Sequence, residues 1–326
     1  MTVFLDKKRW TEVFSGFVIS SVALLDRRAL HFCARQRMSI EESSHLFDHD
    51  IATRLIVLYT DREAGSNCGF RQLTGMAHSV VGVSRPPFPR PSGMVCAMNM
   101  DGDVYPRGGG VEGPMEHIDP GKWPSTLRLK CIRGYTFAVG VGRRVYKRVD
   151  SGTWLAVDAG LPRPDEVTTR MGFEDIDAFS ESDMYAVGGH GDVWHFDGQA
   201  WKQMGFPSNV QLATVTCAGD GNVYISGEGG SLWLGQKSTW KSVYRGTSTV
   251  PWNDVRWFQD KLWLASNYQF YQWDGSAMAR ASHEGEAVPM YGRMDVHDGL
   301  LVIASQDSVR TFDGAAWRHL VEPYDE

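Results

Sequence analysis

A repeat in the second half of the chain constrains the fold more than any other feature of this 326-residue sequence. Five segments align on anchor residues 47, 39, 38 and 39 positions apart, namely Trp154, Trp201, Trp240, Met278 and Trp317. A period near 40 residues, with about four short strands in each unit, is typical of a β-propeller blade. The repeat therefore predicts an all-β fold, a single β-propeller.

Each unit carries the same order of local signals. In the unit that ends at Trp201, the apolar residues 184–187 predict a buried inner strand, and small glycines follow where the blades converge. The pair Asp197-Gly198 predicts a tight type I′ hairpin, because such pairs readily adopt positive φ. Trp201 should then open the outer strand and pack between neighbouring sheets. Met278 takes the place of Trp in one unit and can fill the same gap.

The first 130 residues contain only fragments of this pattern. Residues 17–25, 29–35 and 54–60 read as strands, and residues 94–105 resemble residues 215–224. Asp6 and Trp10 repeat the Asp-x-x-x-Trp spacing and predict a hairpin added at the outside of the ring. We expect one propeller domain over residues 1–326, with degenerate blades and insertions in 1–130 and regular repeats in 130–320. Seven blades of four antiparallel strands are predicted, with six or eight as alternatives.

Two stretches of the N-terminal region break the pattern. Residues 39–50 are acidic and contain two histidines. Residues 85–91, Arg-Pro-Pro-Phe-Pro-Arg-Pro, predict an extended, polyproline-like loop. We interpret both as insertions at blade edges.

The unit over residues 184–201 resembles the degenerate repeats of bacterial propellers of the Ycf48-like and BNR-like type, within the broader class of WD40 and YVTN repeats. The resemblance covers residues 130–320. It implies the propeller fold and leaves activity open, because propellers serve as enzymes, scaffolds and binders. The sialidase Asp-box, S-x-D-x-G-x-T-W, is matched only in part, since Asp150-Ser-Gly-Thr-Trp154 is one residue short. Sialidase activity is therefore not implied.

Charge and hydropathy exclude several classes of protein. A formal net charge of −6 argues against a duplex-binding protein, which normally has a concentrated basic face, and it would suit a basic protein partner. The best apolar run, residues 16–25, is about half the ~20 residues needed to span a bilayer. No signal peptide is apparent. We expect a cytoplasmic monomer that binds neither nucleic acid nor membrane, with its five cysteines reduced or, as the alternative, two of them joined in a disulfide.

Motifs that carry chemistry are not found. His45, Asp48, His49 and Asp50 lie close in sequence, but histidine–aspartate clusters of this kind are usually solvated, so no metal site is predicted. The glycine-rich residues 108–110 and 227–230 lack the Lys-Ser/Thr of a phosphate-binding loop. No GxSxG motif is present. We predict no catalytic residue and no cofactor.

The loops after the second and fourth strand of each propeller blade gather on one face, and this face is the predicted binding surface. It includes tyrosine, tryptophan and arginine, the residue types that dominate binding hot spots. The candidate partner-binding residues are Arg143, Arg144, His190, Asp192, Phe206, Glu228, Trp252, Tyr268, Gln269, Tyr291, Arg293 and Asp307.

Three functions are consistent with these features. The first is a non-enzymatic propeller that binds a protein, in its most concrete form a bacterial cytoplasmic immunity or adaptor protein that occludes a toxin or effector. The second is a glycoside hydrolase or lyase, which requires a polar cluster at one mouth of the central channel. The third is a glycan-binding, lectin-like propeller, which requires matching pockets in several blades. The differences among the aligned Trp194, Trp233, Tyr271 and Arg310 argue against the third.

Overall fold

Strands dominate the computed structural model, which describes residues 4–76, 78–89, 95–99, 101–108, 111–119, 126–162, 171–246 and 250–324. The first sheet holds β1 (Phe17–Asp26), β2 (Ala29–Gln36), β3 (Thr53–Tyr59) and β4 (Cys68–Leu73). The second holds β5 (Val80–Val83), β6 (Val95–Met98), β7 (Asp103–Gly108), β8 (Val111–Glu112) and β9 (Glu116–His117). The third holds β10 (Thr126–Ile132), β11 (Tyr135–Gly140), β12 (Arg144–Asp150) and β13 (Thr153–Ala156).

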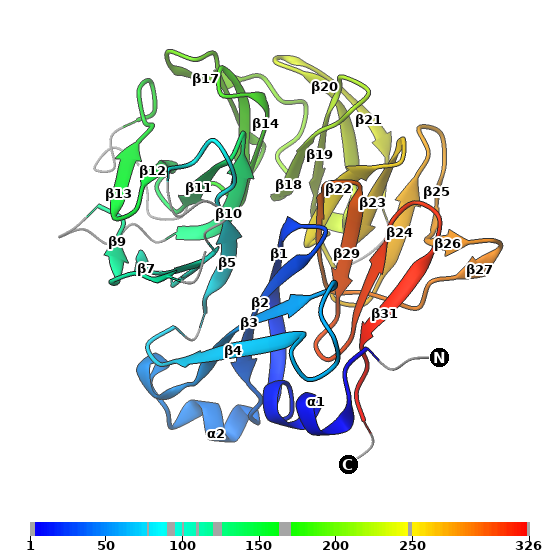
Figure 1. Cartoon of the computed structure of the whole chain (residues 1–326). Helices are drawn as coiled ribbons and strands as arrows, with labels where there is room; N and C mark the ends of the chain where they lie inside the picture. Colours follow the sequence, from blue (N-terminus) through cyan, green and yellow to red (C-terminus); the bar gives the residue numbers. More distant parts are fainter. Residues whose placement is uncertain are drawn as a thin grey trace.

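Four further sheets follow in sequence order. They hold β14 (Asp175–Ser180), β15 (Asp183–Gly188), β16 (Asp192–Phe196) and β17 (Trp201–Met204); β18 (Leu212–Cys217), β19 (Val223–Gly227), β20 (Leu232–Gln236) and β21 (Thr239–Tyr244); β22 (Asp254–Phe258), β23 (Lys261–Ala265), β24 (Phe270–Trp273) and β25 (Met278–Arg280); and β28 (Arg293–His297), β29 (Leu300–Ala304), β30 (Val309–Phe312) and β31 (Trp317–Val321). A two-stranded hairpin, β26 (Ser282–His283) and β27 (Glu286–Ala287), projects outward beside β25 (Figure 1).

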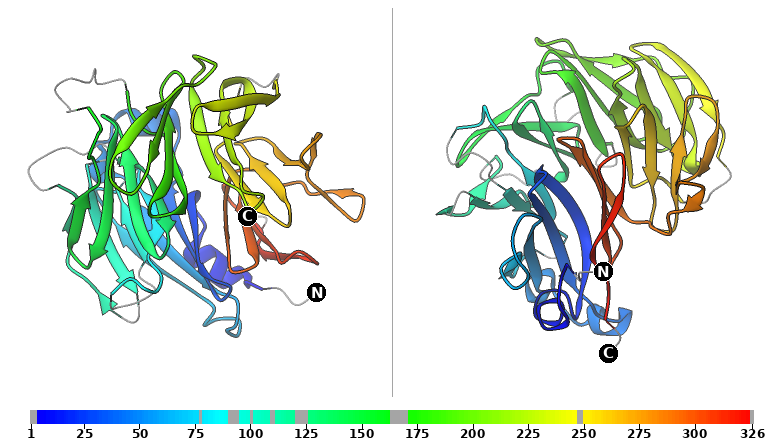
Figure 2. Two further views of the ribbon diagram at one scale, coloured as in Figure 1. Left: turned by 90° about the horizontal axis from the view of Figure 1, so that it is seen from above. Right: turned by 45° about the vertical axis from the view of Figure 1, so that its right-hand side comes forward.

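The sheets form a closed ring, visible from two further directions in Figure 2. The innermost strands β1, β5, β10, β14, β18, β22 and β28 each contact the next, and β28 contacts β1. Over the described residues the ring therefore consists of six four-stranded sheets and one five-stranded sheet, in agreement with the predicted seven blades. No helix in the described part of the chain is long and apolar enough to cross a membrane.

The inner strand of each blade differs from the one expected from the sequence. Residues 184–187 lie in β15, the second strand, whereas β14 is innermost. A second strand is covered on both faces by the neighbouring blades, so it is continuously apolar and buried. The innermost strand faces the channel and alternates, as in Asp175-Ile-Asp177. A continuous apolar run thus marks the second strand.

The Asp-Gly hairpins also form differently from the prediction. Residues 197–200 make a four-residue connection in which Asp197 Oδ1 accepts hydrogen bonds from the N–H groups of Gln199 and Ala200, both at 3.0 Å. Gly198 has a φ of +90°, while Asp197 is not among the residues with positive φ, so the turn is not type I′. The aspartate acts through its side chain, which caps the turn. Trp201 opens the outer strand as predicted and is 2% exposed.

At the N-terminus the three predicted strands are confirmed as β1, β2 and β3, but the predicted hairpin around Trp10 is wrong. Residues 7–13 form the helix α1 (Lys7–Val13), because the Asp6 carboxylate caps it by accepting the Arg9 N–H at 2.8 Å. Residues 95–98 form a second strand, whereas residues 215–217 belong to a first strand, so their resemblance is one strand out of phase.

Helix α1 lies where the ring closes, near the end of β31 (Figure 1). Trp10 packs edge-on against Tyr324, with ring centroids 6.0 Å apart, and the Tyr324 hydroxyl donates to the Leu5 carbonyl at 2.6 Å. One apolar cluster joins α1, the first sheet and the last sheet. The first and last sheets are each complete, so closure depends on packing between them and not on a shared sheet.

The two predicted insertions have defined structures. Residues 39–50 connect β2 to β3 through the helix α2 (Ile40–Ser44), which has a capping box of Ser39 and Glu42, and the turn η1 (Asp48–Asp50). In the proline-rich stretch, the Phe88 N–H donates to the Arg85 carbonyl at 2.8 Å, so the chain turns and is not extended as predicted. Phe88 is 3% exposed, and its burial accounts for the turn. Residues 90–91 lie outside the described residues.

Carboxylates on the innermost strands hold neighbouring blades together. Asp175 accepts the Val215 N–H at 3.1 Å, and Asp254 accepts the Met294 N–H at 3.0 Å. Buried N–H groups need acceptors, and innermost strands of adjacent blades do not pair as a ladder. Asp295 accepts the Leu24 N–H at 2.9 Å and so joins the last blade to the first.

Four of the five cysteines are described with their side chains, and Cys68, Cys131 and Cys217 among them are free thiols. Burial raises the pKa of Cys68 to about 12. A thiol with such a pKa is not a nucleophile at neutral pH.

Candidate partner-binding face

One end of the central channel opens into a pocket of about 620 Å³. All seven innermost strands contribute to it; β1 does so through Ser20–Val22 in its middle, and the other six through residues at or near the position where the strand begins. The connections from the second to the third strand of each sheet lie at the same end, as do the connections that lead into each innermost strand. We call this end the loop face. It carries the loops 141–143, 189–191, 228–231, 266–269 and 305–308.

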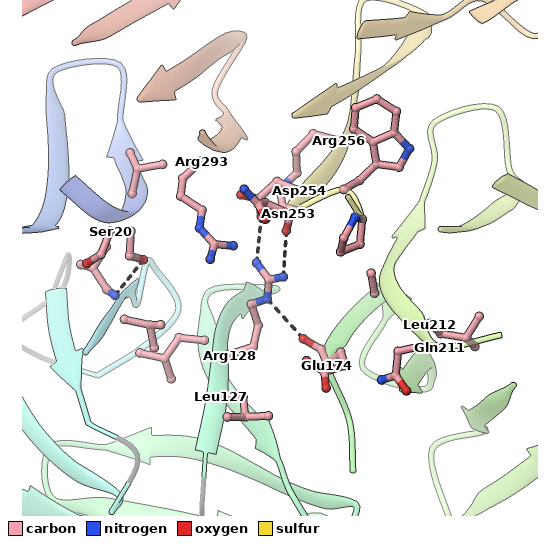
Figure 3. A pocket seen from close by; sticks show the side chains of 18 of the residues that line it. Ser20, Leu127, Arg128, Glu174, Gln211, Leu212, Asn253, Asp254, Arg256 and Arg293 are labelled. Atoms are coloured by element: carbon pink, nitrogen blue, oxygen red, sulfur yellow. Dashed lines mark hydrogen bonds and ion pairs between the residues drawn. The ribbon is translucent and has the colours of Figure 1, made fainter. Parts of the chain in front are cut away.

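A network of ion pairs occupies the channel mouth (Figure 3). Arg128 contacts Asp254 Oδ1 at 2.8 Å and the Asn253 carbonyl at 2.9 Å, and Arg256 contacts the same Asp254 oxygen at 3.0 Å. Burial alone would raise the pKa of Asp254, but the Arg256 and Arg128 guanidinium groups outweigh it and hold the pKa below its usual value. Asp254 is therefore a charged, fully engaged structural group.

Two charged side chains at the mouth lack such partners. Among the described residues, Arg293 forms no hydrogen bond or ion pair through its side chain, and its guanidinium points toward that of Arg128 (Figure 3). Burial lowers the pKa of Arg293, with Asp254 opposing the change. Glu174 also lines the pocket, and burial raises the pKa of its carboxyl group. The mouth thus offers one cation and one carboxyl group that form no ion pair with a described residue and feel their opposite charges, Asp254 and Arg128, only at longer range.

Arg143 and Asp192 lie at the loop face as expected, but they are buried. Arg143 is 7% exposed and Asp192 is 2% exposed. The Arg143 Nε contacts Asp192 Oδ2 at 2.7 Å, and Trp194 Nε1 donates to the same carboxylate at 2.8 Å. This pair links the third and fourth sheets, so neither residue is available to a partner in this arrangement.

Several other candidates are engaged within the propeller. Trp252 is 4% exposed and donates to the Gly230 carbonyl at 3.0 Å, while Phe206 packs against Trp233 and Trp240. Three further polar candidates contact nearby groups through their side chains: Arg144 contacts Asp119 and Tyr146, exposed His190 contacts the Asn209 carbonyl, and Asp307 contacts Ser305 and Ser308. Gln269 donates only its backbone N–H, to Ser266 Oγ.

Four accessible candidates gather at the channel mouth or in the hollow beside it, whereas the exposed His190 lines neither. Glu228 is exposed and lines the mouth, and Arg293 lines both the mouth and a second hollow beside it. Tyr268 and Tyr291 line that second hollow and are 76% and 38% exposed. The structure thus brings together Glu228, Tyr268, Tyr291 and Arg293 at the mouth and the hollow beside it, and the buried Trp252 also lines the mouth.

Sequence reasoning missed residues from the first sheet that reach the same face. Arg35, at the end of β2, lines the second hollow, and Ile40 in the β2–β3 connection lines a third hollow that adjoins it. Ile40 and Phe47 are 90% and 72% exposed. The sequence contained a signal for this, because large apolar residues inside an acidic surface insertion do not belong to the core and so mark a contact surface.

The described residues provide no evidence for a metal site or for a repeated glycan site. No group of three or more His, Cys, Asp and Glu side chains there could hold a metal ion. His49 pairs only loosely with Asp50, at 3.5 Å. Trp194 and Trp233, at positions that a repeated glycan site would use, are each 6% exposed and belong to blade cores.

Comparison with known proteins places the fold and suggests a role. No family model matches the chain. The immune protein Tsi7 of Pseudomonas aeruginosa is 30% identical over 192 residues, which is 59% of this chain and 63% of that protein. The match therefore spans somewhat less than two thirds of the relative.

Solved structures that resemble the chain are propellers. YCF48 bound to D1 peptide aligns with a TM-score of 0.62 and 13% identity, covering 92% of this chain and 94% of that one. YCF48 from Cyanidioschyzon merolae gives 0.59 and 12%, covering 90% and 94%. The WD40 propeller domain of Doa1 gives 0.58 and 11%, covering 89% and 90%. The chain therefore has the β-propeller fold of the Ycf48 and WD40 proteins, and part of it is similar in sequence to a bacterial immune protein.

Proposed function

We propose that this chain is a bacterial immunity protein, a non-enzymatic propeller that binds a toxin or effector protein through its loop face and occludes it. The observation that carries the proposal is the 30% identity over 192 residues with the immune protein Tsi7. Similarity at this level, over most of a propeller, extends well beyond a shared fold. The activity of the relative supports the same class of activity here.

The loop face supports the proposal physically. It exposes Tyr268 and Tyr291 in the hollow beside the charged channel mouth, and Ile40 and Phe47 on the β2–β3 connection; large exposed side chains of this kind are typical of protein–protein hot spots. A propeller of similar fold, YCF48, has been solved with a D1 peptide bound. The proposed contact residues are Glu228, Tyr268, Tyr291 and Arg293, and the hydrogen bond from Trp252 to the Gly230 carbonyl supports the turn that carries Glu228.

Co-expression with neighbouring genes tests the proposal. Each gene that flanks this one in the native genome is induced alone and together with this chain. We expect one flanking product to arrest growth alone, growth to be restored by this chain, and the two proteins to co-purify as a stoichiometric complex. If no flanking product is toxic, or if toxicity persists without any complex, the proposal is wrong.

Oligomeric state and compartment are part of the same proposal. We propose that the chain acts as a monomer in the cytoplasm, where it meets a toxin that has entered or been made in the cell. Light scattering should give a mass near 36.4 kDa for the purified chain. A dimer mass, or recovery of the protein only from the membrane fraction, would contradict this part.

An enzyme in the central channel is the second candidate, because the polar cluster that it requires is present at the channel mouth. Asp254 is held as an anion by two arginines, which leaves Glu174, with its raised pKa, as the better proton donor. The substitution Glu174→Gln distinguishes the two functions. An immunity protein with this substitution should neutralise its toxin about as well as wild type, whereas an enzyme that uses Glu174 as its acid should lose on the order of 100-fold or more in activity.

A further inference from the structure

A hollow of about 420 Å³ opens on the loop face, beside the channel mouth, where the ring closes. Residues at the first, second, sixth and last sheets meet there, and the Ile19 N–H donates to the Gln306 carbonyl at 2.8 Å across the closure. Its lining residues are Val18, Ile19, Ser20, Arg35, His78, Ser79, Val80, Asn267, Tyr268, Tyr291, Gly292, Arg293, Ala304, Ser305 and Gln306. We call it the closure hollow.

The charge of the closure hollow is one-sided. Arg35 and Arg293 line it, together with His78, and none of its described lining residues is an aspartate or glutamate. This is unusual in a chain whose net charge is −6. Elsewhere at the loop face, arginines such as Arg128 and Arg143 are neutralised by aspartates. A cationic hollow with no resident carboxylate has the electrostatics of an anion acceptor.

Polar groups in the hollow are also left without partners among the described residues. Arg35 Nε and Ser79 Oγ are buried atoms with no hydrogen-bond partner there. Arg293 donates no hydrogen bond to a described residue, and burial lowers its pKa. Such groups lose hydration without regaining hydrogen bonds, so they lower the stability of the free protein. Features of this kind are expected where a ligand supplies the missing acceptors.

The surroundings of the hollow fit a protein segment better than a free ion. Tyr268 and Tyr291 stand exposed at its rim. A smaller hollow of about 290 Å³ continues from it along Arg35 and Arg37 to the exposed Ile40 of α2. A small anion would occupy only the cationic part, whereas a peptide would also cover the aromatic and aliphatic groups that flank it.

We propose that the closure hollow binds an acidic segment of the protein partner, with aspartate or glutamate carboxylates paired to Arg35 and Arg293. The proposal deepens the proposed function and rests on it for the identity of the partner. It also reverses the expectation from net charge, which favoured a basic partner, because the local charge at the contact decides complementarity.

Fluorescence anisotropy with a labelled hexaglutamate peptide tests the site without the natural partner. We expect saturable binding that weakens with added salt, and a loss of at least about tenfold for each of Arg35→Gln and Arg293→Gln, because charge-assisted hydrogen bonds are lost. Arg27→Gln is the matched control. It removes the same charge from the exposed turn between β1 and β2, at the opposite end of the ring, and should leave the affinity unchanged.

Thermal melting separates binding from structure. Because neither arginine has a charged partner among the described residues that line the hollow, both variants should melt at the wild-type temperature or above it. Unchanged hexaglutamate affinity in the double variant would overturn the proposal. So would hexalysine binding as tightly as hexaglutamate, inorganic phosphate competing as strongly as the peptide, or a single-stranded oligonucleotide binding more tightly.

The toxin identified by co-expression provides a second test of the acidic-segment proposal. If the wild-type chain binds that toxin and the double variant binds it at least about 100-fold more weakly, both proposals stand. If the double variant binds it as tightly as wild type, the acidic-segment proposal fails and the immunity role survives. If no flanking product binds the wild-type chain, the immunity role fails, and the hexaglutamate result then judges the anionic site alone.

Discussion

Arginines at the channel mouth and arginines in the closure hollow lie at the same end of the ring but have different surroundings. Arg128 and Arg143 are neutralised by aspartates, at 2.8 and 2.7 Å. Arg35 and Arg293 have no carboxylate among the described lining residues of their hollow. The first set holds blades together, whereas the second leaves its charge for another molecule. The contacts of an arginine, and not its position on the face, therefore separate structural from binding residues.

Substitution of Asp254 should have the largest effect on stability, because it removes the carboxylate that neutralises the arginines of the channel mouth. Asp254→Ala leaves Arg128 and Arg256 without their shared carboxylate and the Met294 N–H without its acceptor. Breaking a buried ion pair in this way typically costs about 3–5 kcal/mol. Urea unfolding followed by tryptophan fluorescence should show a correspondingly lower midpoint. A midpoint equal to that of wild type would mean that the channel network is not structural.

His31 is a buried base that can avoid an unpaired buried charge by losing its proton. Burial, with Arg107, lowers the pKa of His31 from 6.5 to about 4. The unfolded chain therefore takes up the proton first as the pH falls. The stability that neutral His31 contributes is fully present above pH 6.5 and is lost between pH 6.5 and 4, on the order of 3 kcal/mol.

Unfolding free energies measured between pH 7 and 4 check this. The slope should be shallower in His31→Gln than in wild type, because the variant has no group that titrates at this position. Identical slopes would show that His31 keeps an ordinary pKa in the folded protein.

Ring closure should depend moderately on Asp295. Asp295→Ala removes the acceptor of the Leu24 N–H, the carboxylate link between the last blade and the first. A buried donor left unsatisfied costs about 1–3 kcal/mol. The loss should be smaller than at Asp254, since the apolar cluster around α1 also holds the closure. Hydrogen exchange in β1 and β28 should quicken first. Equal losses of unfolding free energy in Asp295→Ala and Asp254→Ala would show that ring closure depends mainly on the Asp295 carboxylate.

The smallest effect on stability is expected in the closure hollow itself. Arg293→Ala should shift the free energy of unfolding by no more than about 0.5 kcal/mol, because the side chain forms no hydrogen bond or ion pair with a described residue and Asp254 attracts it only at longer range. A loss as large as that at Asp254 would remove the contrast between the two sets of arginines and assign Arg293 to the structural network.

The regular blades were readable from sequence because their signals are local. Trp201, the Asp197-Gly198 pair and the apolar second strand recur at a nearly constant spacing, and each acts within its own sheet. The strand order was misread by one position, because continuous burial marks the strand covered on both faces and not the one nearest the axis. At the N-terminus, Asp6 and Trp10 matched a turn spacing, but capping made a helix instead.

The candidate site was only partly predictable, because the three-dimensional fold decides which charged side chains form ion pairs. Tyr268, Tyr291 and Arg293 were identified from their place in the loops of regular blades. Arg143 was chosen for the same reason, but it forms a buried ion pair with Asp192, which lies 49 residues away in the next blade. Arg35 was missed because the first blade has no repeat register, and ring closure brings it beside residues of the last blade.

Hydrogen–deuterium exchange on the purified complex with the toxin tests the central claim most directly. Binding at the loop face around the closure hollow should slow amide exchange in residues 35–47, 266–269 and 291–293. The turns at the opposite end of the ring, residues 26–29, 180–183 and 297–300, should exchange as in the free chain. Slowing confined to those opposite turns, with none around Arg35 and Arg293, would contradict the account.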